Sequence, residues 1–239
     1  MPDLEASIPL VLGTRNRKKG QEMAEMIVPT WEVDRHLARL AIQTLDGYPD
    51  LPEVVEDADT FAGNARKKAS QTAQKLGLWA LADDSGLAVD ALKGAPGVYS
   101  ARYAGEPGDD SANNRKLLDA MAEVADARRT AAFRCHLALA DPTGAIRAEA
   151  KGMCRGWITR EPKGDNGFGY DPLFLILEYH KTFGELDPVV KRHLSHRARA
   201  FELLRPRLIQ LIASREMPGS ATPTANSDSG IDNSESDHA

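Results

Sequence analysis

Apolar and polar positions alternate in blocks along the chain, and each block has the period of one kind of secondary structure. Short apolar runs predict buried strands, whereas apolar residues three or four positions apart predict helices. The first half predicts, in order, a strand at Ile8–Gly13, a helix at Lys18–Val28, a short strand at Trp31–Val33, a loop at Gly47–Ala58, a helix at Thr60–Leu76 and a strand at Leu78–Ala82. Thr60 or Asp59 is the expected N-cap of the long helix, and Gly77 is expected to end it.

The second half of the chain has a different order of elements. It predicts a helix at Ser111–Val124, strands at Thr130–Ala140 and Ala145–Arg155, and a final amphipathic helix at Ser195–Ile212. The two strands are joined by Asp141-Pro-Thr-Gly144, a turn sequence that predicts an antiparallel hairpin. The expected fold class is therefore α/β, with parallel crossovers early and an antiparallel hairpin in the middle.

Charge is unevenly distributed between the body of the chain and its end. The segment 217–239 contains Asp228, Asp232, Glu235 and Asp237 but no lysine or arginine. Removing these four negative charges from the net charge of −5 leaves −1 on residues 1–216. A nearly neutral body argues against broad nucleic-acid binding, which needs a basic field. We expect residues 1–216 to form one domain of two lobes and the polar tail, 217–239, to be disordered.

The composition predicts a soluble globular protein, with 42% hydrophobic and 27% charged residues. No apolar run reaches the length of about 18 residues that a transmembrane helix needs. The segment Met1–Ala6 lacks the features of a signal peptide, so the expected location is the cytoplasm. The two cysteines, Cys135 and Cys154, are expected to be buried reduced thiols rather than a disulfide.

The segment Leu81–Asp90 carries the strongest chemical signal. Two adjacent carboxylates, Asp83 and Asp84, follow the predicted strand and precede Ser85 and Gly86. Buried acids need a metal ion or a positive partner, and donors that are all oxygen suit a hard cation such as Mg²⁺. The alternative is a turn in which the aspartate and serine side chains cap their own backbone.

A polar loop, Gly13–Gly20, joins the first predicted strand to the first predicted helix. Free N–H groups at the start of a helix attract anions. With Thr14 and Asn16 as donors and Lys19 as a point charge, the loop suits a phosphate, although it lacks the GxxxxGK[ST] pattern. The alternative is a solvated basic loop.

Two later segments add a possible nucleoside site. Glu161–Pro172 combines several glycines with Phe168 and Tyr170, whose rings can stack on a base. Lys191–Arg197 gathers basic groups directly before the last predicted helix. The alternatives are a surface loop whose aromatic rings fold back on the core, and an electropositive helix entry with Ser195 as its N-cap.

Taken in order, these segments resemble the motifs of the inosine/xanthosine triphosphate pyrophosphatase family. The matching segments are Leu10–Met23, Thr60–Ala69, Ala82–Tyr103, Phe168–Pro172 and Ser195–Arg197, within roughly residues 8–212. The resemblance implies an elongated α/β fold with a central mixed sheet, two lobes and an active-site cleft between them. It also implies Mg²⁺, a homodimer, and hydrolysis of ITP, dITP and XTP to the monophosphate and pyrophosphate, which cleanses the nucleotide pool.

The resemblance also assigns roles to single residues. Asp84 matches the catalytic proton acceptor, Asp84 and Glu56 match metal ligands, and Asp83 would support them. The substrate-binding matches are Thr14, Asn16 and Lys19 for the triphosphate, Ser85 beside it, Phe168, Gly169, Tyr170 and Asp171 for the nucleoside, and Lys191, His196 and Arg197 for the base or phosphates. Asp84 is expected to deprotonate the water that attacks the α-phosphorus, and Lys19 to stabilise the leaving pyrophosphate.

Three positions depart from the family pattern. The family usually has glycine in place of Arg15 and often in place of Lys18. Arg15 either carries the backbone cost of a positive φ or adds a phosphate contact. Gly63 replaces the glutamate of the usual TFxENA motif, which removes a carboxylate near the metal and weakens the helix by roughly 1 kcal/mol.

Base selectivity has a physical basis in the O6 acceptor of hypoxanthine and xanthine. Donors from Lys191, His196 or Arg197 would pair with O6 and lose that bond with adenine. Two alternatives remain open. One is a related pyrophosphatase that acts on modified pyrimidine or methylated nucleotides. The other is a nucleotide sensor without catalysis, motivated by Arg15 and Gly63, which predicts Mg²⁺-dependent binding without turnover.

Overall fold

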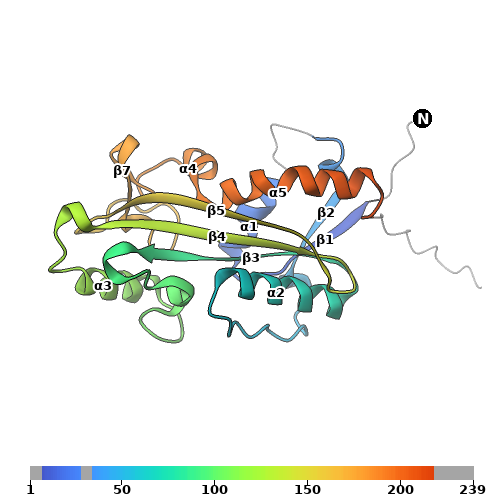
Figure 1. Cartoon of the computed structure of the whole chain (residues 1–239), viewed down its shortest axis with the longest axis horizontal. Coiled ribbons are helices and arrows are strands. Elements are labelled where there is room, and N and C mark those ends of the chain that lie inside the picture. Colours follow the sequence, from blue (N-terminus) through green and yellow to red (C-terminus); the bar gives the residue numbers. More distant parts are fainter. Residues whose placement is uncertain (1–6, 28–33, 218–239) are drawn as a thin grey trace, which may run out of the picture.

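The computed structural model describes residues 7–27 and 34–217, which build a mixed seven-stranded sheet with helices on both faces (Figure 1). The strands are β1 (Ile8–Leu12), β2 (Leu40–Thr44), β3 (Trp79–Val89), β4 (Thr130–Ala140), β5 (Ile146–Ile158), β6 (Phe174–Ile176) and β7 (Lys181–Thr182), and the helices are α1 (Arg17–Ile27), α2 (Phe61–Leu76), α3 (Asp110–Ala120), α4 (Pro188–Leu194) and α5 (His196–Ala213). The strand order is β2-β1-β3-β4-β5-β6-β7, parallel from β2 to β3 and antiparallel beyond. The predicted α/β class is confirmed.

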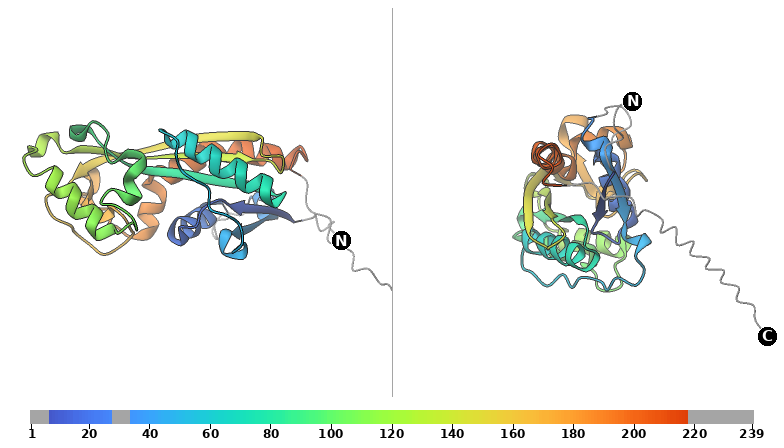
Figure 2. Two further views of the ribbon diagram at one scale, coloured as in Figure 1. Left: turned by 90° about the horizontal axis from the view of Figure 1, so that it is seen from below. Right: turned by 90° about the vertical axis from the view of Figure 1, so that its right-hand side faces the viewer.

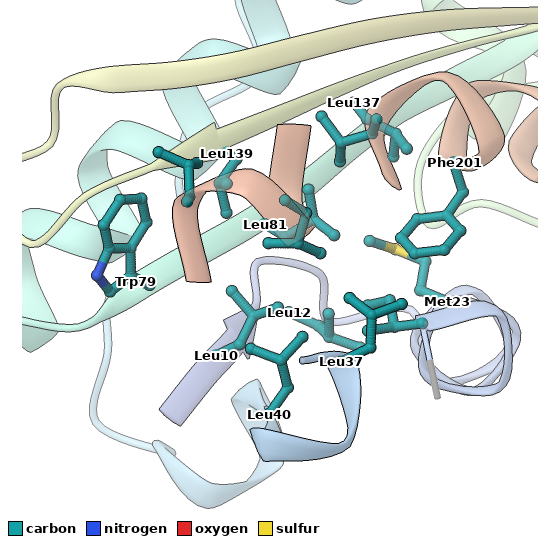
Figure 3. Close-up of a cluster of buried hydrophobic side chains, with 14 of the residues drawn as sticks. Leu10, Leu12, Met23, Leu37, Leu40, Trp79, Leu81, Leu137, Leu139 and Phe201 are labelled. Carbon is teal, nitrogen blue, oxygen red and sulfur yellow. The ribbon is translucent and has the colours of Figure 1, made fainter. Parts of the chain in front are cut away.

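The two faces of the central strands carry side chains of different size. Successive residues of a strand point to opposite faces, so Ala80 and Ala82 share one face of β3 while Leu81 occupies the other. The small-residue face packs on α2 through a cluster of alanines: Ala65, Ala69, Ala73, Ala80, Ala82, Ala138 and Ala140. The large-residue face packs on α5 and α1, so α2 and α5 cover opposite sides of the sheet (Figures 1 and 3).

Two hydrophobic clusters share the long strands β3, β4 and β5. The first surrounds Leu81 and includes Leu12 of β1 and Phe201 of α5 (Figure 3). The second surrounds Leu87, farther along β3, and includes Leu117 of α3. Because three strands run through both clusters, the molecule is elongated (Figures 1 and 2). This is the two-lobed arrangement that the resemblance implies.

Several local predictions are confirmed. The Thr60 side chain caps α2 by accepting a hydrogen bond from the Gly63 N–H at 3.1 Å, and Gly77 ends the helix with a left-handed φ of 64°. Cys135 and Cys154 are buried and free. Within the described ranges, no helix combines the length and apolar character that crossing a bilayer would require.

Other predictions about elements were wrong or incomplete. The strand expected to end at Ala82 continues as β3 to Val89, so Asp83 and Asp84 lie in its middle. Strand propensity disfavours aspartate, and the continuation depends on cationic partners from elsewhere in the chain. Elements β2, β6, β7 and α4 were not predicted, and α3 ends at Ala120 rather than Val124. The strand expected at residues 31–33 and the tail beyond Met217 lie outside the described residues, but Met217 itself is buried in the first cluster.

The hairpin turn between β4 and β5 provides a first testable prediction, because the Asp141 carboxylate holds it together. Asp141 Oδ1 accepts hydrogen bonds from Thr143 N–H at 2.9 Å, Thr143 Oγ1 at 2.6 Å and Ala145 N–H at 3.2 Å. We expect Asp141→Ala to lower the free energy of unfolding at pH 7 by about 2 kcal/mol, because bonds to a charged group are lost. Chemical denaturation measures this, with exposed Glu202→Ala as the control.

The Asp141 contribution should depend on pH in a defined direction. Burial acts to raise its pKa, but the Thr143 and Ala145 hydrogen bonds and Arg147 outweigh burial and hold the pKa below 3.8. A lowered pKa in the folded state means that the stabilisation is present above the unfolded pKa and is lost as the pH falls through the folded one. The difference between wild type and Asp141→Ala should persist to about pH 4 and shrink below it. A constant difference down to pH 2 would contradict this account.

Candidate active site

The acidic residues of β3 lie beside the polar loop Gly13–Gly20 because β1 is shorter than β3. β1 pairs with β3 only as far as Leu12 opposite Leu81, and the Gly13 N–H donates to the Leu81 carbonyl at 2.8 Å. β3 continues beyond this point, so the loop that follows Gly13 lies beside the next residues of β3. Asn16 Oδ1 accepts from the Lys19 N–H at 3.1 Å and caps the first turn of α1. The first turn of α1 therefore lies near the acids, with Lys19 Nζ 3.7 Å from Asp83 Oδ2.

Asp84 lies on the alanine side of the sheet, which faces α2. Its carboxylate accepts hydrogen bonds from Asn64 Nδ2 and Lys68 Nζ, both at 3.1 Å, and these two α2 residues are one helical turn apart. Lys68 Nζ also donates to Glu56 at 2.9 Å. Burial acts to lower the pKa of Lys68, but Asp84, Asp83 and Glu56 raise it, so Lys68 is a cation. Burial is the main cause of the raised pKa of Asp84.

Asp83 lies on the opposite side of the sheet, which faces α5. Arg197 donates to its Oδ2 from Nε at 3.3 Å and from Nη2 at 3.2 Å, and Lys19 Nζ is 3.7 Å away. Although burial acts to raise its pKa, Lys19, Arg197 and Lys68 hold the pKa of Asp83 far below its usual value. The two adjacent acids therefore would not bind one ion together. Asp84 lies beside Glu56 on one side of the sheet, and Asp83 forms an ion pair with Arg197 on the other.

A second ionic network lies between α1, α4 and the glycine-rich loop, Glu161–Pro172. Lys191 Nζ contacts Asp171 at 2.7 Å and Glu22 at 3.0 Å, and Glu22 also accepts from Arg197. Asp171 Oδ2 in turn accepts from the Phe168 N–H at 2.8 Å. Burial opposes the charge of Lys191, but Asp171 and Glu22 raise its pKa, so the network holds a charged ammonium beside the loop.

The aromatic residues of this region divide between the cleft and the core. Phe168 is half-buried, with Lys191 Nζ 4.8 Å from its ring centroid. Tyr170 is 3% exposed, and its hydroxyl donates to the Ser100 carbonyl at 2.9 Å, so its ring packs in the second cluster rather than offering a free stacking face. His196 stacks on Phe133 with centroids 4.9 Å apart, and burial lowers its pKa well below 6.5.

Two hollows that share lining residues form one cleft over these groups. One contains Thr14, Arg15, Glu56, Lys68 and Asp84, and the other contains Phe168, Gly169, Tyr170, Asp171, Lys191, His196 and Arg197. Asn16, Lys19, Ser85 and Ala101 line both hollows. The sequence-predicted catalytic, metal-binding and substrate-binding residues therefore all lie along one cleft, whereas the supporting Asp83 lines neither hollow. The first half of the cleft carries facing carboxylates and ammonium groups, and its second half carries an aromatic ring and buried basic groups.

Comparison with known proteins shows which family this chain belongs to. Residues 10–207 match the profile of the Ham1 family. The chain belongs to the Ham1 family. It is 54% identical to a dITP/XTP pyrophosphatase of Rhodopirellula baltica, over 86% of this chain and 95% of that protein, and 52% identical to one of Desulforamulus reducens, over 81% and 92%. A HAM1 protein from Coxiella burnetii has a similar structure, with a TM-score of 0.74, 38% identity and coverage of 85% of this chain and 99% of that one.

The departures at Arg15 and Lys18 have structural explanations. Among the described residues, positive φ angles outside glycine occur only at Lys93, His180 and Arg215, so Arg15 carries no such backbone cost. Its guanidinium donates to the Leu51 carbonyl at the rim of the first hollow. Lys18 Nζ lies 5.8 Å from the centroid of the Phe168 ring. Both side chains therefore add positive charge to the rim of the cleft of this Ham1-family chain.

Sequence reasoning missed several residues of the site, and three of them contact its charged groups. Asn64 and Lys68 contact Asp84, and Glu22 joins Lys191 to Arg197. The helical period offered a signal for two of them, because Asn64 and Lys68 share the face of α2 that carries the buried alanines. A polar residue within an apolar helical face needs a buried partner, and Asp84 is that partner.

Gly63 is the third position that departs from the family pattern, and it provides a second testable prediction. A Cβ at Gly63 would lie 2.6 Å from Ala58 Cβ and 3.2 Å from Thr60 Oγ1. Replacing a helix glycine by alanine normally stabilises by about 1 kcal/mol, but overpacking costs about 1–3 kcal/mol. We therefore expect Gly63→Ala to lower the melting temperature, and Ala58→Gly added to it to restore most of the loss. Scanning calorimetry of the two variants measures both effects, and a stabilised single variant would contradict the expected clash.

Proposed function

We propose that this chain hydrolyses the deaminated purine nucleotides ITP, dITP and XTP to the monophosphate and pyrophosphate, which removes them from the nucleotide pool. The observation that carries the proposal is the divided cleft, with facing carboxylates and ammonium groups at one end and a ring with buried basic groups at the other. Relatives at 54% and 52% identity are dITP/XTP pyrophosphatases, which supports the same reaction here.

A divalent cation, Mg²⁺, is the cofactor that we expect at the carboxylate end. Glu56 and Asp84 accept hydrogen bonds from the same Lys68 Nζ, at 2.9 and 3.1 Å, so the two carboxylates lie beside each other and are the residues that would hold the ion. Across the described part of the chain, no three His, Cys, Asp or Glu side chains are grouped to hold an ion. With only the two carboxylates as protein ligands, such an ion would take its other ligands from phosphate and water. When bound, such an ion would offset negative charge on the phosphates.

We assign the attacking water to Asp84 and the phosphates to the cations around it. Asp84 would take a proton from water as the water oxygen attacks the α-phosphorus. The bond from that phosphorus to its bridging oxygen then breaks, and pyrophosphate leaves with the electron pair. Lys19 and Lys68 would stabilise the charge that develops on the leaving group. Thr14, Asn16 and Ser85 line the same part of the cleft and would orient the phosphate chain.

Base recognition is assigned to the other half of the cleft. The half-buried Phe168 ring would stack on the base. Arg197 already donates to Asp83, Glu22 and Ser85, so few of its N–H groups are left for a ligand. His196 and Lys191 line the same hollow, and His196 is neutral at pH 7 because burial lowers its pKa. A 6-carbonyl group would accept from these donors, whereas the 6-amino group of adenine would leave them unpaired.

We also propose the organisation in which the enzyme works. Residues 1–216 would act as one catalytic domain and 217–239 as an appended acidic tail, although the buried Met217 belongs to the folded part. The resemblance implies a homodimer, and we propose the cytoplasm as the place where the enzyme works. Light scattering after size-exclusion chromatography should give twice the mass of one chain, and the mass of a single chain would contradict the dimer.

The decisive experiment is pyrophosphate release from a panel of nucleotides with Mg²⁺. We expect rapid turnover of ITP, dITP and XTP and little turnover of ATP, GTP or dTTP. Equal turnover of all six nucleotides would contradict the assignment of base recognition but would leave the proposed reaction intact. A modified pyrimidine nucleotide and a methylated nucleotide are assayed in addition, and preference for either would favour the related pyrophosphatase. Mg²⁺-dependent ITP binding without release would favour the nucleotide sensor over the enzyme.

A further inference from the structure

Helix α3 holds the backbone of the glycine-rich loop by two hydrogen bonds to a single residue, Gly169. The Gly169 N–H donates to Asp110 Oδ2 at 2.8 Å, and Asn114 Nδ2 donates to the Gly169 carbonyl at 3.0 Å. Asp110 and Asn114 are one helical turn apart and therefore share a face of α3. Gly169 has a left-handed φ of 61°, which favours glycine. Because its N–H and its carbonyl are both bonded to α3, one helix holds the peptide groups on both sides of this turn.

The same helix holds the opposite wall of the cleft. Asn113 Nδ2 donates to the Ala101 carbonyl at 3.1 Å, and Asn113 Oδ1 accepts from the Ala104 N–H at 2.7 Å. Ala101 lines both hollows, and the next residue, Arg102, donates to the Glu56 carbonyl at 3.3 Å. α3 therefore connects the carboxylate side of the cleft with the loop that carries Phe168.

Helix α3 is held in place by its buried packing, whereas the loop that it contacts is rich in glycine. α3 is fixed in the second hydrophobic cluster by Leu117, which is fully buried. The loop contains Gly164, Gly167 and Gly169, each with positive φ, and glycine loses more conformational freedom on ordering than other residues. Ordering such a loop at the moment of binding would reduce affinity, so contacts that order it beforehand increase affinity.

We propose that Asp110 and Asn114 are positioning residues that hold the Gly169 turn, and with it Phe168, in the conformation that receives the base. This inference rests on the proposed function. Their effect falls on the affinity for the nucleoside part of the substrate and not on the phosphate chemistry. Asp110 is suited to this position because a carboxylate in the first turn of a helix is stabilised by the helix dipole.

The test compares variants of Asp110 in the full-length enzyme, since its exposed side chain can be changed without disturbing the core. For Asp110→Ala we expect the KM for ITP to rise about tenfold, as for the loss of one charge-assisted hydrogen bond, with kcat changed less than about threefold. Asp110→Asn should keep a KM within about threefold of wild type, because its amide oxygen still accepts from Gly169. Asn114→Ala should raise KM in the same way as Asp110→Ala.

Two controls separate positioning from a general structural effect. Asp109→Ala removes the N-cap of α3, which accepts from the Ala112 N–H at 2.9 Å, but leaves both bonds to Gly169. Its KM should equal that of wild type. Inorganic tripolyphosphate, which has no base, should inhibit wild type and Asp110→Ala with the same Ki. A KM unchanged in Asp110→Ala, or a KM raised equally in Asp109→Ala, would overturn the inference.

Failure of the proposed function can be told apart from failure of this inference. If the wild type binds ITP but releases no pyrophosphate, the proposed function fails. The positioning role is then decided by calorimetric titration with ITP and Mg²⁺, where Asp110→Ala should weaken binding about tenfold relative to Asp109→Ala. Equal Kd values for those two variants would overturn the positioning role by itself.

Discussion

Asp84→Asn is expected to reduce pyrophosphate release from ITP by about a thousandfold, within the range of about 10²–10⁴ ascribed to a general base. The substitution would also remove one of the two proposed metal ligands. The substitution keeps the shape of the side chain and an oxygen that can accept from Lys68. It removes the negative charge and the capacity to take a proton. Lys68 keeps Glu56 as an ionic partner at 2.9 Å, so the α2 contact survives.

A matched control lies just beyond the same strand. Asp90 directly follows β3, and its carboxylate accepts from Thr130 Oγ1 at 2.7 Å outside the cleft. Asp90→Asn should therefore leave kcat and KM unchanged. Steady-state pyrophosphate release from ITP with Mg²⁺, measured for both variants at equal protein concentration, gives the comparison. Far-ultraviolet circular dichroism and melting curves verify that Asp84→Asn is folded.

The outcome also separates the catalytic roles from each other. If Asp84 is the base and shares a cation with Glu56, then Glu56→Gln should weaken activation by Mg²⁺ more than it lowers the rate at saturating Mg²⁺. Turnover of Asp84→Asn within tenfold of wild type would show that another group accepts the proton. In that case the carboxylate end of the cleft binds phosphates without performing the chemistry that we assign to it.

Arg197→Met is expected to lower the free energy of unfolding by about 3–5 kcal/mol, the loss typical of removing one member of a buried ion pair. Arg197 is 2% exposed and donates to Asp83 from two nitrogen atoms, at 3.3 and 3.2 Å. After the substitution Asp83 would remain fully buried, with Lys19 at 3.7 Å as its remaining near cation on that side. Asp83 Oδ1 already lacks a hydrogen-bond partner among the described residues.

The control for this prediction is on the same helix. Arg199 is exposed, donates to the Met153 carbonyl at 3.1 Å and lines neither hollow of the cleft. We expect Arg199→Met to change stability by less than about 1 kcal/mol. Urea denaturation of both variants at pH 7 measures the difference. A loss below about 1 kcal/mol for Arg197→Met would show that the buried charges are compensated elsewhere.

A double variant tests whether the loss comes from the uncompensated charge. Replacing both members of a buried ion pair by apolar residues is often close to neutral. Asp83→Leu combined with Arg197→Met should therefore be less destabilised than the sum of the two single variants, with a coupling of about 1–3 kcal/mol. Additive losses would assign the destabilisation to packing and to the other Arg197 partners, Glu22 and Ser85.

Local signals in the sequence predicted much of this protein. The Thr60 cap and the Gly77 stop define α2, and the Asp141–Gly144 turn defines the β4–β5 hairpin. These features depend on backbone preferences within a few residues, so the sequence alone contains them. The family resemblance then selected Asp84, Glu56 and the loop residues, and the structure brings all of them to one cleft.

The tertiary structure decided how these residues are paired. Aspartate is a poor strand former, so sequence reasoning ended the strand at Ala82, and only cations from α1, α2 and α5 allow β3 to continue through Asp83 and Asp84. Once the strand continues, its alternation sends the two acids to opposite faces. The buried partners of the acids are distant in sequence, since Arg197 is 114 residues from Asp83. Charge compensation between such distant residues depends on which elements pack together, and no local sequence pattern specifies that packing.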